Sequence, residues 1–335
     1  MTGTSTINEG ISTALGTFLE ERHAEAAAID GRLGPLVDEL RRAVFSGGKR
    51  LRPLFAVWGH RAVGAEVDER MLRAAASLEM LHTFALIQDD VIDRSATRRG
   101  APASHVMLAA HAERGDRERF GASAAILLGD LALIWADRML GESGFPSDRL
   151  RAGYRIYNEL RAEVALGQYL DVLASHLERL TEEDALRVSR YKTATYTVQR
   201  PIQLGMALGG APRELLDLVP AYAIPAGVAF QLRDDLLGAF GDPDATGKPS
   251  GEDLLERKPT WLLARTLRLR PEAAHVSDVA GLRQAMLESG AVAEAESKIG
   301  ALAEEALEAA RRMPVPAERA TELVDLTERL VWRTS

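Results

Sequence analysis

The sequence predicts an all-α protein, built as a single large helical bundle with a central cavity. Ala, Leu, Glu and Arg are strong helix formers and dominate the chain, whereas aromatic residues make up only 5% of its 335 positions. The alternation of apolar and polar residues that marks strands is almost absent. No change of composition marks a linker, so we expect one domain over residues 1–335, with a loose segment at residues 1–6.

Glycine and proline mark where the individual helices end. A first helical segment ends near Gly31 and Pro35, and a short basic loop runs from Gly47 to Pro53. Five long helices are expected after it, over residues 69–94, 119–141, 148–175, 181–209 and 213–239. We expect bends in the last two because proline removes a helix hydrogen bond, and they contain Pro201, Pro220 and Pro225.

Composition excludes several classes of function. The net charge of −8 opposes nucleic-acid binding, since 49 acidic residues outnumber 41 basic ones and no long basic arm is present. The chain has no cysteine, which excludes disulfides and thiolate metal sites. Its most apolar run, residues 124–133, is interrupted by Asp130, and no basic-then-apolar leader opens the chain. We therefore expect a cytoplasmic protein without a transmembrane segment.

An acidic cluster, formed by Asp89, Asp90 and Asp93, ends the helix expected over residues 69–94. Asp89 and Asp93 are four residues apart and share one helix face, where like charges repel. The helix dipole is also negative at this end. A solvated helix end is one interpretation. The apolar residues that precede the cluster favour another, bound Mg²⁺, which prefers carboxylate and phosphate oxygens.

A second acidic cluster, Asp234 and Asp235, follows Gln231 in another apolar helix. Two such clusters on separate long helices suggest facing walls of one cavity, with metal ions held between them. A di-iron carboxylate site is the competing interpretation, but it needs two Glu-x-x-His pairs. The chain offers one match to this spacing, Glu79 with His82, and a second is missing.

Basic residues gather around the same segments. Lys49 and Arg52 lie in the glycine-rich loop, where the backbone can approach an anion, and Arg98 and Arg99 follow the first acidic cluster. Further cations are Lys192, Lys248 and Lys258. Phosphate groups need both neutralising metals and clamps of this kind. The pattern favours a diphosphate site, and the absence of a GxxxxGK[ST] motif argues against an ordinary nucleotide loop.

Between residues 47 and 260 the chain resembles the trans-isoprenyl diphosphate synthases (polyprenyl synthetases) in five motifs, which occur in the order GGKRLRP, DDVID with RRG, YKT, FQLRDD and GKPSGEDL. It is most similar to the bacterial geranylgeranyl diphosphate synthases. The resemblance implies an isoprenoid synthase-like fold, a homodimer and a magnesium-dependent prenyltransferase. The implied reaction is the head-to-tail (1'-4) condensation of isopentenyl diphosphate with a C5 to C15 allylic diphosphate, giving linear all-trans geranylgeranyl diphosphate (C20).

The resemblance also implies a role for each candidate residue. The diphosphate of isopentenyl diphosphate would be held by Lys49, Arg52, His82 and Arg99. Three Mg²⁺ ions would be bound by Asp89, Asp93 and Asp234, with support from Asp90 and Asp235. The allylic diphosphate would be contacted by Arg98, Lys192, Gln231, Lys248 and Lys258. Catalysis around the departing carbocation would involve Lys192, Thr193, Gln231 and Lys258.

Two residues one turn before the first acidic cluster bear on product length. In the resembling family, side chains at this place form the floor of the pocket for the allylic tail. Small Ala85 beside bulky Phe84 is similar to the C20 synthases, although a buried phenylalanine is also common in cores. The chain departs from the family pattern at Gly238, Gln88 and Pro259, where aspartate, histidine and arginine are common, and at Arg257, where glycine is usual.

Three alternatives stay open. A farnesyl or geranylfarnesyl diphosphate synthase would differ only in product length. A class I terpene cyclase would carry an Asn/Asp-Asp-x-x-Ser/Thr-x-x-x-Glu motif, where this chain has Gly238 and Asp242, and would not need Lys49 and Arg52 for a second diphosphate. A non-catalytic partner subunit of a prenyl synthase would have lost its aspartate motifs, whereas the first motif is intact here.

Overall fold

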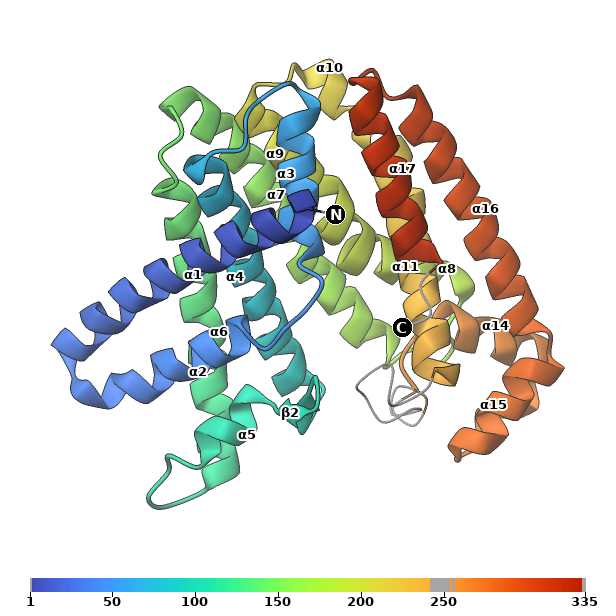
Figure 1. Cartoon of the computed structure of the whole chain (residues 1–335). Helices are drawn as coiled ribbons and strands as arrows, with labels where there is room; N and C mark the ends of the chain where they lie inside the picture. The colour runs from blue at the N-terminus through green and yellow to red at the C-terminus, as the bar shows by residue number, and fades with distance from the viewer. Residues whose placement is uncertain (1, 242–253, 255–256, 333–335) are drawn as a thin grey trace. The chain divides into compact units, whose positions relative to one another are not determined.

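Figure 1 shows the computed structural model of the protein, which describes residues 2–241, 254 and 257–332. These residues are almost wholly helical apart from one two-stranded hairpin, so the predicted all-α class is confirmed. The chain divides into two compact units, residues 1–57 with 66–150 and residues 58–65 with 151–335. The single domain expected from the sequence stays a prediction.

The first unit is built around α4 (Glu69–Ile92) and α6 (Arg117–Gly141), which pack along each other, with α1 (Thr2–Ile29) and α2 (Gly34–Val44) against α4. The unit is completed by η1 (Gly31–Leu33), the start of α3 (Leu51–Ala62), β1 (Thr97–Arg98), β2 (Ala101–Pro102) and α5 (Ser104–Ala109). Helix α1 begins at Thr2, in place of the loose segment expected over residues 1–6.

Helix α4 carries most of the candidate residues of this unit. Asp68 caps its N-terminus, where the side-chain oxygen accepts a hydrogen bond from the amide of Met71 (3.1 Å). Every residue from 74 to 81 is buried, as the mostly apolar sequence of this stretch requires. Beyond it one face stays buried and the other is partly open, and the open face carries His82, Ala85 and Asp89. The middle of α4 is therefore held in the core, and one face of its last three turns is partly exposed.

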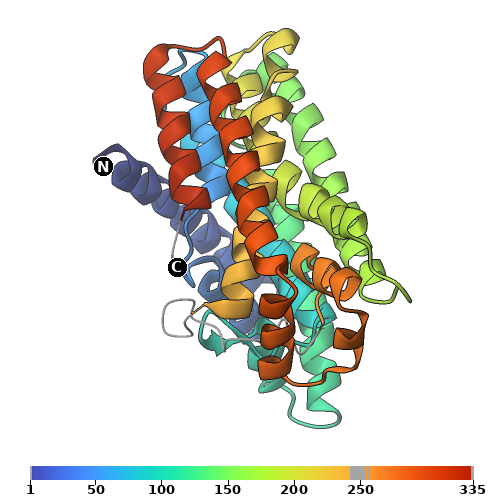
Figure 2. The same cartoon turned by 90° about the vertical axis from the view of Figure 1, so that its right-hand side faces the viewer.

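The second unit centres on α11 (Val219–Phe240), which packs against η2 (Ser189–Gln199) and α16 (Ala291–Arg312). Helices α16 and α17 (Ala317–Val331) run side by side in both views (Figures 1 and 2). The other elements are the end of α3, most of α7 (Ser147–Ala174), α8 (Glu182–Val188), α9 (Arg200–Gly209), α10 (Arg213–Leu216), α14 (Trp261–Leu269), η3 (Pro271–His275) and α15 (Val279–Glu288).

The long helices expected from the sequence are present, with two changes. The segment 181–209 forms three consecutive pieces, α8, η2 and α9, and the segment 213–239 is interrupted between α10 and α11. The middle piece, η2, is a π-helix of 11 residues, a rare form that is frequent at functional sites. Pro220 falls in the first turn of α11, where the amide hydrogen would have no partner within the helix. Pro201 falls where η2 passes directly into α9, and Pro225 lies inside α11.

Two helical stretches are long and apolar enough to cross a membrane by length and composition alone, namely α6 and Arg213–Phe240. Core helices of water-soluble proteins pass the same test, and 39% and 50% of the two apolar windows are buried inside the protein. These stretches are therefore weak support for a membrane span. Helix α6 leaves one apolar stripe exposed, with spacing of seven residues: Phe120 (45%), Leu127 (64%) and Ile134 (61%).

Gly59 in α3 lies at a close approach between helices of the second unit. A β-carbon there would lie 2.2 Å from the carbonyl oxygen of Ile202, a backbone atom of α9. We expect Gly59→Ala to lower the free energy of unfolding by about 3 kcal/mol, because overpacking forces the two backbones apart. Gly16→Ala in α1 is the control, because a β-carbon there meets no atom within 4 Å, and it should raise the free energy of unfolding by about 0.5–1 kcal/mol. Urea unfolding measures the free energy of unfolding of both variants. Equal effects of the two substitutions would contradict the close approach at Gly59.

Candidate active site

The first acidic cluster stands where α4 ends and the chain turns back. Asp93 caps the helix, and its amide donates to the carbonyl of Asp89 (2.8 Å). The chain then reverses through β1 and β2, with Arg94 and Arg99 in the left-handed backbone region (φ 54° and 53°). This reversal returns Arg98 to the end of α4, where its guanidinium meets the carboxylates.

Arg98 binds two of the three aspartates. Its Nε donates to Asp90 Oδ1 (2.8 Å), and its Nη2 lies 3.5 Å from Asp89 Oδ2. Burial, the largest single influence, works against the charged form of Arg98. The hydrogen bonds to Asp90 and the negative charges of Asp90, Asp89 and Asp93 together outweigh it, so the pKa of Arg98 is raised. Asp90 is itself only 4% exposed, so its carboxylate serves to hold Arg98. The supporting role of Asp90 at a metal stays a prediction.

Asp89 and Asp93 are the candidates for metal binding on α4. They lie one turn apart, and both are partly exposed. Across the residues that the structure describes, no group of three or more His, Cys, Asp or Glu is placed to hold a metal ion. Mg²⁺ commonly takes one or two protein carboxylates and completes its shell with water and substrate phosphates. The pair therefore fits a magnesium ion that is shared with a diphosphate.

Cationic side chains surround His82, two turns before the acidic cluster. Burial, followed by the guanidinium groups of Arg52, Arg99 and Arg98, lowers the pKa of His82 well below its ordinary value of 6.5. The ring is therefore neutral at physiological pH. Three of the four residues predicted to hold isopentenyl diphosphate are thus brought together, and the fourth, Lys49, is exposed in the loop before α3.

Glu79 places a buried carboxyl group among these cations. It is 4% exposed and lies one turn before His82 on α4. Burial raises the pKa of its carboxyl, although the nearby guanidinium groups of Arg52, Arg50 and Arg99 act to lower it. The two effects oppose each other, and burial is the larger.

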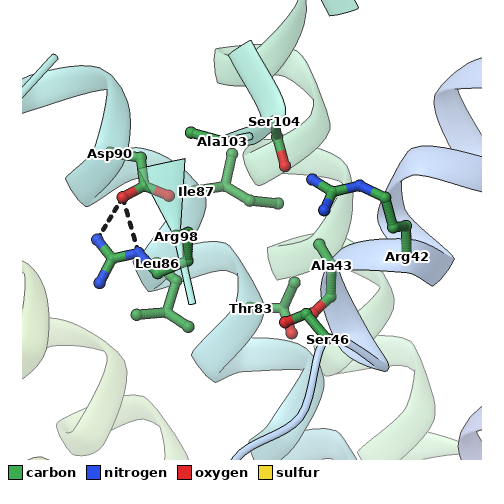
Figure 3. Close-up of a pocket in the computed structure, with 10 residues that line it drawn as sticks. All are labelled: Arg42, Ala43, Ser46, Thr83, Leu86, Ile87, Asp90, Arg98, Ala103 and Ser104. Atoms are coloured by element: carbon green, nitrogen blue, oxygen red, sulfur yellow. Dashed lines mark hydrogen bonds and ion pairs between the residues drawn. The ribbon is translucent and has the colours of Figure 1, made fainter. Parts of the chain in front are cut away.

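Figure 3 shows a small pocket of the first unit beside the ion pair of Asp90 and Arg98. The pocket is lined by Arg42, Ala43, Ser46, Thr83, Leu86, Ile87, Asp90, Arg98, Ala103 and Ser104. Arg42 is engaged by α2 and the hairpin, because it pairs with Glu39 (Nε–Oε2 2.6 Å) and donates to the carbonyl of Pro102 (3.0 Å). The residues of α4 that line the pocket are Thr83, Leu86, Ile87 and Asp90, of which only Leu86 is partly exposed. The pocket therefore lies mainly on the buried face of α4 and not on the face that carries His82.

The residues just before the acidic cluster divide between the open face of α4 and its contact with α6. Phe84 and Ala85 are both partly exposed, and their part in product length stays a prediction. Gln88 donates to the carbonyl of Ile126 in α6 (3.3 Å). A β-carbon at Gly129 would lie 2.7 Å from the side-chain nitrogen of Gln88. Gln88, which replaces the histidine common in the family, therefore ties α4 to α6.

The second acidic cluster belongs to the second unit, where η2 packs against α11. Thr193 Oγ1 donates to Gln231 Oε1 (2.6 Å), and Gln231 Nε2 donates to Asp235 Oδ1 (2.9 Å). These two bonds fix the orientation of the Gln231 amide and engage one oxygen of Asp235. Asp234, partly exposed on the same helix, is the candidate metal ligand of this unit.

Lys192, beside Thr193 in η2, pairs with a residue that the sequence analysis missed. Its Nζ lies 2.6 Å from Oδ2 of Asp171 in α7. One acid in a helix of mixed charge is usually a solvated surface residue, so its type gave no signal. The spacing of Asp171 from a glycine did offer a signal, because Gly167 lies four residues earlier and therefore on the same helix face.

Lys258 lies between the two residues that depart from the family pattern in this segment. Arg257 has a left-handed φ of 51°, which explains why glycine is usual there. Its guanidinium donates to the carbonyls of Ala274 (2.8 Å) and Val276 (2.6 Å), which holds the strained turn. Pro259 is buried immediately before α14, and Lys258 is partly exposed.

The remaining expectations about the site are untested. Lys248 and Asp242 lie outside the described residues. The two acidic clusters belong to different units, and the expectation that they line one cavity stays a prediction.

The chain matches a family model described as polyprenyl synthetase over residues 35–297. It is 32% identical to a geranylfarnesyl diphosphate synthase of Aeropyrum pernix, over 84% of this chain and 88% of that protein. It is 30% identical to a geranylgeranyl diphosphate synthase of Methanosarcina mazei, over 82% of each chain. Among solved structures it is similar to a Corynebacterium glutamicum geranylgeranyl pyrophosphate synthase complexed with isoprenyl diphosphate and magnesium. The TM-score is 0.92 and the identity 39%, over 97% of this chain and 98% of that one.

The neutral His82 predicts a pH dependence of stability. Its folded pKa lies below 6.5, so between the two values the unfolded chain binds a proton that the folded chain does not. As the pH falls below about 6.5, this histidine should reduce the free energy of unfolding by up to about 1.4 kcal/mol per pH unit. The reduction continues until the pH reaches the lowered folded pKa.

Urea unfolding of the wild type and His82→Asn between pH 8 and pH 5 measures this contribution. The difference in free energy between the two proteins should change with pH only below about 6.5. Parallel curves throughout the range would show that the folded protein does not exclude a proton from His82.

Proposed function

The chain belongs to the polyprenyl synthetase family, and from this premise we propose that it joins isopentenyl diphosphate head to tail (1'-4) to an allylic diphosphate. The product is linear all-trans geranylgeranyl diphosphate, the C20 compound after which several of its relatives are named. The prenyltransferase class predicted from the motifs is confirmed by the family match. Relatives named for farnesyl and geranylfarnesyl diphosphate make C15 and C25 products the nearest alternatives.

The observation that carries the proposal is the pairing of two unlike anion sites on α4. The first is the neutral His82 among guanidinium groups, which suits a diphosphate that needs no metal. The second is the partly exposed pair Asp89 and Asp93, with Arg98 held beside it, which suits a diphosphate that brings Mg²⁺. Isopentenyl diphosphate would take the first site and the allylic diphosphate the second.

The reaction begins when the allylic C–O bond breaks and its electron pair leaves with the diphosphate. Magnesium held by Asp89, Asp93 and Asp234 would supply positive charge to stabilise this leaving group. Donors from Arg98, Lys192, Lys248 and Lys258 would bind the diphosphate oxygens as their charge grows. The oxygens of Thr193 and Gln231, which the bond between them keeps in place, would stabilise the allylic carbocation.

The carbon–carbon bond forms when the double bond of isopentenyl diphosphate attacks the carbocation. A proton then leaves the new cation, and the departed diphosphate can accept it. No protein nucleophile or general base is required, so the residues act by binding, orientation and charge. Phe84 and Ala85, two partly exposed apolar positions of α4, would line the allylic tail and exclude water from the carbocation.

Three finer points complete the proposal. Three magnesium ions would take part, two at the first acidic cluster and one at Asp234. The protein would work in the cytoplasm, which agrees with a chain that has no cysteine. It would be a homodimer, since the exposed apolar stripe of Phe120, Leu127 and Ile134 on α6 is the kind of surface that a second copy covers.

Product analysis tests the proposed function. The purified protein is incubated with isopentenyl diphosphate and Mg²⁺, separately with C5, C10 and C15 allylic diphosphates, and the dephosphorylated products are sized by mass spectrometry. We expect a linear C20 alcohol from each starter and no turnover once EDTA removes the magnesium. A cyclic hydrocarbon formed without consumption of isopentenyl diphosphate would indicate a terpene cyclase. A lack of turnover with every starter would indicate a non-catalytic partner subunit.

Phe84 is expected to set the length of the product. Its position on α4 is about 7.5 Å before Asp89 along the helix, at 1.5 Å per residue, which is where a growing allylic tail would be stopped. Phe84→Ala should therefore shift the main product from C20 to C25 or longer while leaving the rate of isopentenyl consumption within about threefold. The same product analysis measures the shift.

Phe45→Ala is the matched control for this prediction. Phe45 follows α2 and is 38% exposed, so the same side chain is removed away from the open face of α4. The control should keep the C20 product. An unchanged product from Phe84→Ala would show that Phe84 is a packing residue and that another feature limits the chain.

A further inference from the structure

We propose that Asp171 is a positioning residue that holds the ammonium group of Lys192 in its working orientation. The proposal rests on the proposed function, in which Lys192 contacts the allylic diphosphate. Asp171 is part of none of the five motifs that carry the family resemblance. It lies on α7, whereas the aspartates assigned to metal binding lie at the end of α4 and on α11.

The ion pair is short and partly shielded from water. Lys192 Nζ lies 2.6 Å from Asp171 Oδ2, and the two side chains are 28% and 19% exposed. A charge-assisted hydrogen bond in such a setting is stronger than an ion pair on the open surface. Lysine is a flexible chain that ends in a point charge, without the fixed geometry of arginine. The carboxylate of Asp171 therefore restrains where the ammonium group points.

Gly167, one turn before Asp171, brings α7 against η2 at this point. A β-carbon at Gly167 would lie 2.6 Å from the amide nitrogen of Lys192 and 2.8 Å from the carbonyl carbon of Tyr191. Any larger residue would push the two backbones apart. Because residues four apart share a helix face, this backbone contact places Asp171 beside the Lys192 side chain.

Helix α11 approaches η2 in the same way. A β-carbon at Gly227 would lie 2.4 Å from Cα of Ala194, and Gln231, four residues later, accepts the hydrogen bond of Thr193. Two helices thus approach the π-helix through a glycine, and each supplies a polar partner one turn further on. One partner fixes Thr193 and the other fixes Lys192, which are consecutive residues of the proposed allylic site.

The exposure of the pair indicates that Asp171 matters more for orientation than for folding. Lys192 is 28% exposed, so the loss of this carboxylate leaves an ammonium group that water can reach and not a fully buried charge. We therefore expect Asp171→Asn to fold, with a melting temperature close to that of the wild type. The same change should lower kcat by about 10- to 100-fold, because a misplaced donor no longer meets the charge that grows on the leaving diphosphate. The KM for isopentenyl diphosphate should stay within about twofold.

A double-mutant cycle separates positioning from a merely structural effect. The wild type, Asp171→Asn, Lys192→Gln and the double variant are assayed with isopentenyl diphosphate and the best allylic starter. If Asp171 acts through Lys192, Asp171→Asn should change kcat by less than about twofold once Lys192 is replaced. Should Asp171→Asn fail to fold, the cycle is run with Asp171→Glu, which keeps the carboxylate on a longer arm.

The two glycines of α7 provide a matched pair of further variants. Gly167→Ala should reproduce the loss of kcat, because it moves α7 away from Lys192. Gly153→Ala makes the same change in the same helix, but its β-carbon would meet the side-chain end of Leu208 at 2.8 Å, which can adjust. It should keep kcat within about twofold of the wild type.

The possible results separate this proposal from the proposed function. An active wild type with a non-additive cycle supports the role of Asp171. An active wild type in which Asp171→Asn costs the same with and without Lys192 overturns that role and leaves the proposed function standing. A wild type that consumes no isopentenyl diphosphate overturns the proposed function and this role together.

Discussion

The crowding of carboxylates at the end of α4 is the constraint on which the rest of the site depends. Three aspartates within five residues repel one another and also meet the negative end of the helix dipole. The β1–β2 hairpin offsets part of this repulsion, because it turns the chain back and places the guanidinium of Arg98 beside Asp90 and Asp89. Under the proposed function, Mg²⁺ held by Asp89 and Asp93 would offset more of this negative charge. Ligands that bind only the folded protein stabilise it, so a helix end that is unfavourable alone would become favourable in the loaded enzyme.

The same helix carries the opposite imbalance two turns earlier. There the excess charge is positive, and the protein limits it by keeping His82 neutral. At 1.5 Å per residue, His82 and Asp89 are about 10 Å apart along α4. Under the proposed function, this helix would present two diphosphate sites of different chemistry, one neutralised by side chains and one by metal ions. A cyclase handles a single diphosphate and would need only one of them.

The sequence was sufficient for the parts of the structure that rest on local patterns. Long apolar helices and the glycine and proline residues that end them predicted the all-α fold. The family resemblance, and not a local pattern, implied that Arg52, His82 and Arg99 lie together. The sequence was insufficient where a partner comes from elsewhere in the chain. Asp90 meets Arg98 only because a hairpin turns the chain back, and Asp171 meets Lys192 only because two helices touch. The first helical segment was expected, but its start at Thr2 was not, because residues 2–6 are polar and have no apolar pattern of their own. The helix becomes anchored only further along, at Ile11 and Leu15, which are buried.

The π-helix η2 is the least predictable element, and it is also the one that the second acidic cluster needs. A π-helix takes one more residue per hydrogen-bonded turn than an α-helix, so it rotates the side chains that follow relative to those before it. Helices α8 and α9 can then each keep an apolar face in the core while Lys192 and Thr193 turn toward α7 and α11. Residues 193 to 199 are all buried, including Thr195, whose hydroxyl donates to the carbonyl of Tyr191 (3.1 Å). Such a rare geometry persists because its neighbours hold it, and the glycines of α7 and α11 allow those neighbours to come close enough.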